Sequence, residues 1–352
     1  MGRKRDNESQ DSDNDIIKPP KRMKRQQQLP VEIITREIKS INDLIELGES
    51  YDPKAKKTYN IDLRTLSYMA NPLRDLQSLI GMEKVKQNIL VQILYFLQNM
   101  HKGNIDMLHC VIQGPPGVGK TELAKIIGRI YSRMGILETG IFIIAKRSDL
   151  VGKYLGQTAI KTQNVIDDAY GGVLLIDEAY SLGNEEGRDS FSKECIDTLN
   201  QNLTENKNNF MCIIAGYEDA LEKCFFSVNP GLQRRFNFKY TIDGYSPSEL
   251  RQILVKLIKD QLWSYQEPIE SALPLQFFKE NIKLFTNYGG DMETLFFNIK
   301  MCHSQRVFCL PIEQKTVITK EDLENGMKMF AQNKKIIPNK KEMNPSIQHL
   351  YI

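Results

Sequence analysis

The sequence predicts an α/β fold, in which a parallel sheet flanked by helices is followed by a small all-helical domain. One observation is that short aliphatic runs alternate with segments of helical periodicity, and these runs cover residues 108–112, 141–145, 173–176 and 210–215. Undiluted apolar runs of this length between helices are typical of strands that are buried on both faces of a parallel sheet. A second observation is that the alternation ends near Ser246, after which only helical patterns follow.

Helical periodicity is clear on both sides of the first aliphatic run. Apolar residues recur at helical spacing from Val85 to Leu97, which predicts an amphipathic helix over residues 82–100. A second apolar stripe, from Leu123 to Tyr131, predicts a helix that packs on the sheet.

The helical C-terminal part begins with a start signal. Ser246 and Glu249 have the spacing of a capping box, and Pro247 occupies the first helical position. A further helix is expected to begin near Asp291 and another at Thr319. No strand pattern interrupts these segments, so a helical domain is expected.

Five segments are expected along the chain. The first is a charged, disordered tail, because the first thirty residues hold eight Lys or Arg and five Asp or Glu but few aliphatic residues to bury. The expected segments are this tail at 1–30, an N-terminal helix and polar linker at 31–70, the α/β domain at 71–245, the helical domain at 246–333 and a C-terminal tail at 334–352.

Composition argues against several classes of protein. The chain has 352 residues, 41% of them hydrophobic, and its net charge of +3 is too small to indicate nucleic-acid binding by bulk electrostatics. No apolar run approaches the roughly 18 residues of a membrane span, and the first thirty residues lack the apolar core of a signal peptide. Six cysteines without a CxxC pair indicate reduced thiols and no zinc site. We expect a cytoplasmic protein, with a nuclear location left open by the basic segment from Lys21 to Arg25.

A phosphate-binding loop follows the first predicted strand. The segment fits the P-loop pattern GxxxxGK[ST] and comprises Gly114, Pro115, Pro116, Gly117, Val118, Gly119, Lys120 and Thr121. Glycines let backbone N–H groups converge on phosphate oxygens, and the N-terminus of the following helix adds partial positive charge. In this arrangement Lys120 reaches the β- and γ-phosphates and the Thr121 hydroxyl ligates Mg²⁺. The sequence therefore predicts a site for ATP and Mg²⁺ in a P-loop NTPase sheet.

A second motif supports the same site. The aliphatic run 173–176 ends in Asp177 and Glu178, and a strand that ends in an acidic residue beside a P-loop has the Walker B arrangement. Asp177 is expected to hold Mg²⁺ through water, whereas Glu178 is expected to polarise the water that attacks the γ-phosphate. For this pair taken alone, two solvated acids at a strand end are the alternative.

Taken together, these motifs resemble those of AAA+ ATPases. The segments GPPGVGKT, IDEA and NPGLQRRF occur in that family's order. Longer stretches resemble the CbxX/CfxQ branch, which includes the red-type Rubisco activases, and they look most like versions carried by large DNA viruses. These stretches begin at Leu79, Leu150, Gly171 and Ala215. The resemblance covers residues 71–331.

The resemblance implies an assembly and further site residues. Members of the family form rings, usually hexamers, with ATP between subunits. Arg235, together with Arg234, would be the arginine finger that acts on the neighbour's γ-phosphate, for which the always-charged guanidinium fork is suited. Tyr154 matches the aromatic pore loop that grips a protein client, and Ile80 and Gly81 match the segment that lies against adenine. A solvated arginine pair and a tyrosine packed on its own domain are the alternatives.

Two positions depart from the family's pattern. Family members usually carry Asn at the end of the sensor-1 strand, but residues 215–217 read Ala-Gly-Tyr, as in this branch, so no polar sensor is assigned there. The branch's sensor-2 motif Gly-Asn-Ala-Arg is replaced by Gly-Asp-Met-Glu, which puts Glu293 where a cation should meet the γ-phosphate. Lys300, two helical turns later, is the cation that could substitute.

Three functions remain open on the sequence alone. The leading hypothesis is an ATP-hydrolysing ring, a homo-oligomer that remodels a protein client as a chaperone or activase does. The second is an AAA+ machine that acts on nucleic acid, such as a loader, which the segment at Lys21 permits but no RNP-like aromatic pattern supports. The third is a regulatory scaffold that binds ATP with little turnover, which is motivated by Glu293.

Overall fold

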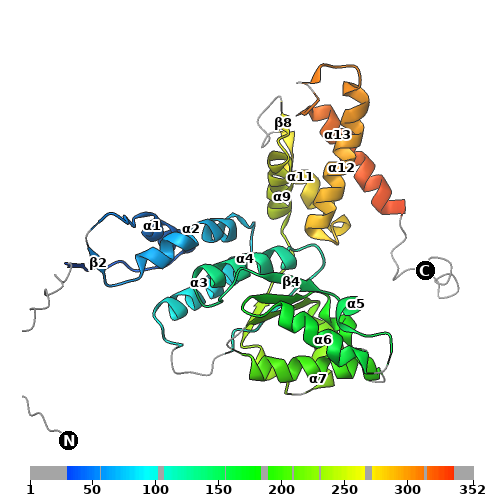
Figure 1. Ribbon diagram of the computed structural model, residues 1–352. Coiled ribbons are helices and arrows are strands. Elements are labelled where there is room, and N and C mark those ends of the chain that lie inside the picture. Colours follow the sequence, from blue (N-terminus) through cyan, green and yellow to red (C-terminus); the bar gives the residue numbers. More distant parts are fainter. Residues whose placement is uncertain are drawn as a thin grey trace, which may run out of the picture.

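The structure of the protein is a computed structural model (Figure 1). It describes residues 30–336 except 56, 102–106, 155, 184–188, 208–209, 230, 266–271 and 313–314. Nearly all of the expected N-terminal tail, with its basic segment from Lys21 to Arg25, and most of the expected C-terminal tail therefore lie outside the described residues.

A five-stranded sheet forms the centre of the α/β part. Its strands run parallel in the order β4-β5-β6-β3-β7. Their bounds are β3 Cys110–Gln113, β4 Phe142–Ala145, β5 Val173–Ile176, β6 Met211–Gly216 and β7 Phe238–Thr241. Each of the four predicted runs overlaps one strand, so the predicted parallel α/β fold is confirmed. The sequence did not indicate β7, because this edge strand leaves Lys239 and Thr241 exposed and is not an undiluted apolar run.

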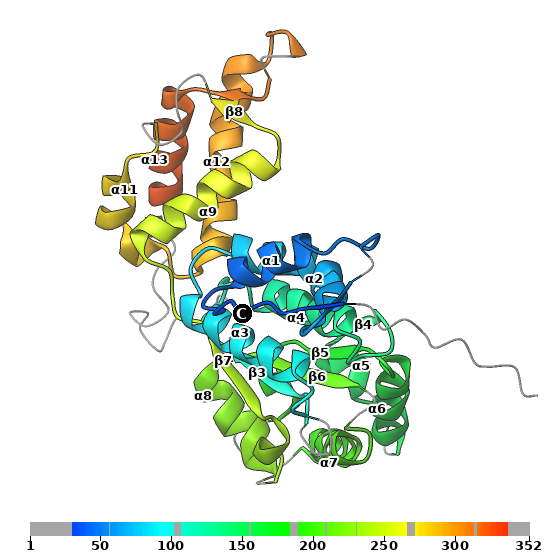
Figure 2. The ribbon, with the colours of Figure 1, turned by 90° about the vertical axis from the view of Figure 1, so that its left-hand side faces the viewer.

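The side chains of the sheet alternate between two apolar cores, as the two-residue period of a strand requires. Cys110 and Ile112 of β3 face the first core, whereas Val111 of the same strand faces the second. Figure 2 shows helices on both sides of the sheet. The helices that flank the sheet include two that bury apolar side chains in the first core and two that do so in the second. They are, in this order, α3 (Glu83–Leu97), α4 (Lys120–Arg133), α6 (Gln157–Asp168) and α7 (Ser190–Glu205).

The N-terminal part of the described chain contributes to the first core. Here α1 (Ile41–Glu49) packs against α2 (Leu63–Ser78), and α2 packs on α4. Residues 31–70 were expected to hold one helix and a polar linker, but a second helix, α2, begins within them at Leu63. The domain boundary expected at residue 71 falls inside the same helix.

Pro72 explains why the sequence did not indicate α2. A proline in a helix interior costs about 3 kcal/mol, so Asn71 and Pro72 read as a break. In the structure, α2 buries apolar side chains that each contribute about 1.5–3 kcal/mol and offset this cost. They include Leu66, Met69, Leu73 and Leu76.

The part of the chain after Ser246 has an apolar core of its own. In Figure 1 its yellow-to-red helices lie above the sheet. The predicted capping box starts the first of them, because Ser246 Oγ accepts from the N–H of Glu249 at 3.3 Å and Glu249 Oε2 accepts from the N–H of Ser246 at 2.7 Å. The helices are α9 (Pro247–Asp260), α11 (Leu275–Glu280), α12 (Tyr288–Val307) and α13 (Lys320–Ile336).

Two short parallel pairs, β1 with β2 and β8 with β9, were not expected from the sequence. Each strand is only two residues long, which is too short to leave a periodic pattern. Their bounds are Val31–Glu32, Thr58–Tyr59, Ser264–Tyr265 and Val317–Ile318. Within the described ranges, none of the helices combines the length and apolarity that crossing a membrane requires.

Candidate functional site

The phosphate-binding loop connects β3 to α4, as predicted. Its backbone is left-handed at Gly117 (φ +71°) and Gly119 (φ +87°), a conformation that glycine adopts without steric cost. Gly117 also lies against the helical part, since an added Cβ atom would be 1.9 Å from the carbonyl oxygen of Asn287. The carbonyl oxygen of Gly117 accepts a hydrogen bond from the N–H of Gly289 at 2.9 Å. The loop is therefore held between the sheet and the C-terminal helices.

Lys120, the first residue of α4, folds back onto this loop. Its Nζ donates hydrogen bonds to the carbonyl oxygens of Gly114 at 2.9 Å and Pro115 at 2.8 Å. Burial lowers the pKa of Lys120, and the nearby Asp177 and Glu178 carboxylates oppose this shift. The two carbonyl groups thus hold the ammonium group at the entrance to the helix, where a phosphate group could replace them.

The residues predicted to hold Mg²⁺ lie together. The Thr121 hydroxyl donates to Asp177 Oδ2 at 3.1 Å, and Oδ1 of the same carboxylate accepts from the N–H of Glu178 at 3.1 Å. Mg²⁺ is usually bound by one or two protein oxygen ligands together with substrate phosphates and waters, so this pair fits the ion. In the described part of the chain, no group of three or more His, Cys, Asp or Glu residues could hold another metal.

Glu178 occupies a strained position directly after β5. Its φ of +52° places a non-glycine residue in the left-handed region, a conformation that costs about 1–3 kcal/mol and is concentrated at functional sites. The residue is exposed and caps the next turn, η1 (Ala179–Leu182). A carboxylate at this point, beside the phosphate-binding lysine, can accept a proton from an attacking water.

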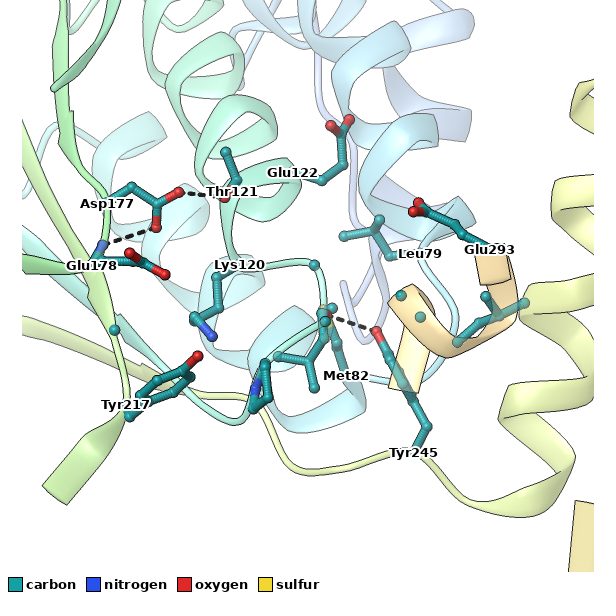
Figure 3. A pocket seen from close by; sticks show the side chains of 18 of the residues that line it. Leu79, Met82, Lys120, Thr121, Glu122, Asp177, Glu178, Tyr217, Tyr245 and Glu293 are labelled. Atoms are coloured by element: carbon teal, nitrogen blue, oxygen red, sulfur yellow. Dashed lines mark hydrogen bonds between the residues drawn. The ribbon is translucent and has the colours of Figure 1, made fainter. Parts of the chain in front are cut away.

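These groups line one end of a cavity of about 590 Å³, here called the P-loop pocket (Figure 3). Residues 116–121 of the predicted loop line it, whereas Gly114 and Pro115 do not. The other end is apolar, which suits a planar base such as adenine. That end is formed by Leu79, Met82, Ile253 and Leu257.

The residues that were expected to lie against adenine do not line the P-loop pocket, whereas the residues on either side of them in the chain do. Leu79 and Met82 line the P-loop pocket, but Ile80 and Gly81 between them do not. Gly81 has a φ of +67°, and an added Cβ atom would be 2.5 Å from Oε1 of Glu249. Gly81 therefore packs against the start of α9 instead of facing the pocket.

The helical part closes the P-loop pocket from the opposite side. The Tyr245 hydroxyl donates to the carbonyl oxygen of Val118 at 2.9 Å. Gly289 and Gly290 line the pocket at the start of α12, and so does Glu293. Figure 3 shows Glu293 on the same side of the pocket as Leu79. A carboxylate thus stands where the sequence analysis noted a missing cation.

Lys300 does not replace that cation. Its Nζ donates to Oε1 of Gln261 at 3.1 Å and lies 4.6 Å from the centroid of the Phe296 ring. Lys300 is not among the residues that line the P-loop pocket. The earlier expectation is therefore wrong, because two turns of helix carry this side chain to a different neighbour.

Three further predicted site residues lie outside the P-loop pocket. Tyr154 is 70% exposed, which disagrees with the alternative of a tyrosine packed on its own domain. Arg234 is exposed and Arg235 is half-buried, and the two residues end the short turn Gln233–Arg235. Neither arginine lines the pocket of its own chain.

A hydrogen-bond network connects the Tyr154 segment with the turn that follows Glu178. It centres on Arg147, whose Nη1 donates to the carbonyl oxygen of Ser181 in η1 and to Oγ of Ser192, both at 2.7 Å. The Nη2 atom donates to Asp189 at 2.5 Å. Arg147 precedes Tyr154 by seven residues. The Arg147 guanidinium group therefore links the segment before Tyr154 to the turn that follows Glu178.

Two tyrosines line the P-loop pocket that the sequence analysis did not assign, namely Tyr180 and Tyr217. Their rings stack with centroids 5.2 Å apart, and Lys120 Nζ lies 5.0 Å from the centroid of the Tyr217 ring. A signal was available, because Tyr217 follows the aliphatic run 210–215 after a single glycine. The carboxyl ends of parallel strands meet at one edge of a sheet, and ligands bind there.

Comparison with known proteins finds several relatives. Residues 110–243 match the family described as "ATPase family associated with various cellular activities (AAA)". A cfxQ-like protein of Acanthamoeba polyphaga mimivirus is 42% identical over 302 residues, which cover 85% of this chain and 74% of the relative. Stage V sporulation protein K of Bacillus subtilis is 36% identical over 220 residues, or 61% of this chain and 67% of the relative. Protein CbbX of Cereibacter sphaeroides is 34% identical over 203 residues, or 56% and 65%.

A solved structure has a similar fold. The FIGL-1 AAA domain in complex with ADP matches with a TM-score of 0.51, covering 78% of this chain and 87% of that chain. The two sequences are 19% identical over this match, so it supports the fold alone.

Proposed function

Since the chain belongs to the AAA ATPase family, in the branch of the CfxQ-like proteins, we propose that it uses ATP hydrolysis to remodel a protein client. ATP hydrolysis itself is the activity of this family. The observation that carries the proposal is the convergence of Lys120, Thr121, Asp177 and Glu178 at one end of the P-loop pocket, opposite an apolar end that fits a base.

The proposed reaction assigns one role to each of these groups. Lys120 exchanges its loop carbonyls for the β- and γ-phosphates. A water oxygen forms a bond to the γ-phosphorus while the bond from that atom to the β–γ bridging oxygen breaks. ADP leaves with the electron pair, and Glu178 accepts a proton from the water. Thr121 and Asp177 would hold Mg²⁺, which when bound neutralises charge on the phosphate oxygens.

The arginine finger is proposed to come from a neighbouring copy in a homo-oligomeric ring, with a hexamer as the proposed state. Two observations support this. Arg234 and Arg235 do not line the pocket of their own chain. Nε of Arg235 is buried without a hydrogen-bond partner among the described residues, so this side chain is not saturated within its own chain. An arginine in trans would complete the charge stabilisation that one chain lacks.

Residues 246–333 are proposed to act as a lid on the ATP-binding domain of residues 71–245. The support is that the lid and Tyr245, which directly precedes it, contact the loop at its backbone. Tyr245 donates to the carbonyl oxygen of Val118, and Gly289 donates to that of Gly117. A change in the loop on nucleotide binding would therefore be transmitted to the helices.

Tyr154 is the proposed contact with an extended protein client. Its exposed ring offers a broad apolar surface with few torsions to order. Arg147 links the segment before it to η1, the turn capped by Glu178. A rearrangement around the γ-phosphate could thus shift Tyr154 without direct contact between the two sites.

Turnover measurements on the full-length chain test this proposal. ATP hydrolysis should be stimulated by unfolded protein and not by DNA, and Lys120→Ala should abolish nucleotide binding and turnover. A matched control is Lys84→Ala, because Lys84 is exposed outside the P-loop pocket. Stimulation by DNA alone would contradict the protein-client proposal. A wild-type chain that binds ATP without turnover would favour the regulatory scaffold.

A further inference from the structure

A second cavity, here called the edge groove, lies beside the edge strand β4. It has a volume of about 1300 Å³, and residues of α2, α4 and β4 line it. In Figure 2, β4 lies at the margin of the sheet next to α4. Of the described lining residues, Glu122 and Lys125 alone are shared with the P-loop pocket, and neither has a role in the proposed ATP chemistry. The edge groove is therefore a separate site.

One edge of β4 has no strand partner in the described part of the chain. The strand pairs with β5 alone, and the N–H of Val173 donates to the carbonyl oxygen of Ile141 at 2.9 Å. Neighbouring residues of a strand direct their backbone groups to opposite sides, so those of Phe142 and Ile144 point away from β5. Both residues line the edge groove. An extended chain that enters the groove can pair with these backbone groups.

The floor of the edge groove is apolar and partly exposed. Ile141 is 42% exposed, Ile144 43% and Tyr68 51%, and all three line the groove. Exposed apolar side chains that gather in one place mark a binding surface more than single ones do. The floor therefore suits an apolar side chain of the entering segment.

Helix α4 lines the edge groove with a row of three basic residues, Lys125, Arg129 and Arg133. Their four-residue spacing places them on one face of the helix, about 6 Å apart along its axis. Arg129 lies 2.8 Å from Asp75 and Lys125 lies 3.9 Å from Glu122, but these side chains are about half exposed, and exposed ion pairs contribute little. Arg133 is exposed and forms no ion pair with a described residue. The basic row is therefore available to carboxylates.

A matching pattern of acidic residues occurs in the part of the chain that lies outside the described residues. Asp11, Asp13 and Asp15 alternate with other residues, and Ile17 continues the alternation. In an extended chain, alternate residues lie on one side at intervals of about 6.8 Å. This interval is close to the spacing of the basic row on α4. The charged residues from 18 to 29 are all basic, so the complementary charge is confined to the earlier segment.

The chain is long enough to bring this segment to the edge groove. The carbonyl oxygen of Pro30 accepts from the N–H of Thr58 at 3.0 Å. Ser67, nine residues after Thr58, lines the groove, and nine residues span at most about 32 Å. The thirteen residues from Ile17 to Pro30 span up to about 45 Å when extended. The acidic segment can therefore reach the groove of its own chain.

We propose that the segment from Asp11 to Ile17 binds in the edge groove of its own chain and pairs with the free edge of β4. Its aspartates contact the basic row of α4, and Ile17 contacts the apolar floor. This interaction goes beyond the proposed function and does not depend on ATP hydrolysis.

Hydrogen exchange of the full-length chain tests the proposal. The aspartate variant combines Asp11→Ser, Asp13→Ser and Asp15→Ser. In this variant, the proteolytic fragment that contains β4 should exchange about tenfold faster than in wild type, because three charge contacts are lost and the N–H groups of Phe142 and Ile144 lose their acceptors.

The matched control replaces three basic residues of the same tail, Lys21→Ser, Arg22→Ser and Lys24→Ser. It changes as many charges and should leave the exchange of β4 within about twofold of wild type, since the proposal gives these residues no contact in the groove. Equal exchange in wild type and in the aspartate variant overturns the proposal. Equal acceleration by both triple variants overturns it too, because the effect would then follow from charge loss anywhere in the tail.

Arg133→Glu examines the groove side of the contact. It should speed the exchange of β4 by about threefold and should add nothing in the aspartate variant, because the contact is then already lost. Lys84→Glu is the control for charge reversal, since Lys84 is exposed and does not line the groove. Independent effects of the groove and tail substitutions would contradict a direct contact.

A mixture of the aspartate variant and the Arg133→Glu variant identifies the chain that supplies the segment. If the segment binds within its own chain, neither variant regains the slow exchange of wild type. Recovery in the aspartate variant, whose groove is intact, would show that a second copy supplies the segment, and this result overturns the proposal.

Discussion

The two walls of the P-loop pocket differ in the kind of group they present. The sheet wall offers ionic and hydroxyl groups at the ends of α4 and β5, where Lys120, Thr121 and Asp177 lie within hydrogen-bond reach of the loop or of each other. The helical wall, from Tyr245 to Glu293, includes no Lys or Arg among the described lining residues. It contacts the loop through a phenol hydroxyl and a backbone N–H.

This difference assigns the phosphate chemistry to the sheet wall and the closure of the pocket to the helical wall. Groups on the sheet wall sit on the ends of strands and a helix that two apolar cores hold rigidly. The helical wall has a core of its own and meets the loop at backbone atoms. Phosphate chemistry should therefore depend on the sheet wall, while the helical wall should respond to the shape of the loop and hardly to phosphate charge.

The largest effect is expected from Arg235, which a neighbouring copy would contribute to the P-loop pocket. Subunits with Arg235→Ala that still bind ATP, mixed into wild-type subunits, should reduce hydrolysis more than dilution does. An arginine finger accelerates the reaction by about 10³–10⁵, so each subunit interface that lacks one would hydrolyse almost no ATP. Turnover is measured against the fraction of mutant subunits. A strictly linear loss, in a mixture shown to co-assemble, would place Arg235 outside the neighbour's site.

Glu178→Gln should slow ATP hydrolysis at the sheet wall without removing ATP binding there. Loss of a general base lowers kcat by about 10²–10⁴, while the contacts of Lys120 and Thr121 with the phosphates remain. The measurements are single-turnover hydrolysis and ATP affinity by calorimetry. Normal turnover in this variant would show that another group activates the water.

Tyr154→Ala tests a surface outside both walls. Basal hydrolysis should stay within a few-fold of wild type, whereas stimulation by a protein client should be lost, because the ring contacts the client and not the nucleotide. Tyr154→Phe should keep most of both activities, since the hydroxyl performs no chemistry. The control is Tyr170→Ala, which removes another exposed tyrosine beyond the far end of α6. A destabilised Tyr154→Ala protein with intact client stimulation would contradict the pore-loop assignment.

The smallest effect is expected on the helical wall. Glu293→Gln removes a negative charge that faces the pocket and should strengthen ATP binding by roughly fivefold, because about 1 kcal/mol of repulsion is lost. Glu122→Gln is the comparison, since Glu122 lines the same pocket but lies 3.9 Å from Lys125, which already offsets its charge. An equal gain from both substitutions, measured as ATP affinity, would show that the two walls do not differ in this respect.

The parts of the site that the sequence predicted are those built from contiguous segments. Strand, loop and helix follow one another around Lys120, and the run before Asp177 is apolar on both faces of the sheet. The parts it missed come from long-range neighbours. Met82 reaches the pocket because Gly81 turns toward α9, and Tyr217 faces Lys120 because β6 lies beside β3.

The sequence by itself determined the α/β class, the phosphate-binding loop and the acidic strand end, because strand burial and glycine geometry leave local patterns that do not depend on distant partners. Only the tertiary structure decided that α2 is a helix, since the burial of its apolar face outweighs the cost of Pro72. It also decided that Lys300 turns to Gln261 and that Glu293 faces the pocket. Such outcomes depend on which surfaces meet across the fold, and contacts between residues far apart in the chain leave no periodic signal along it.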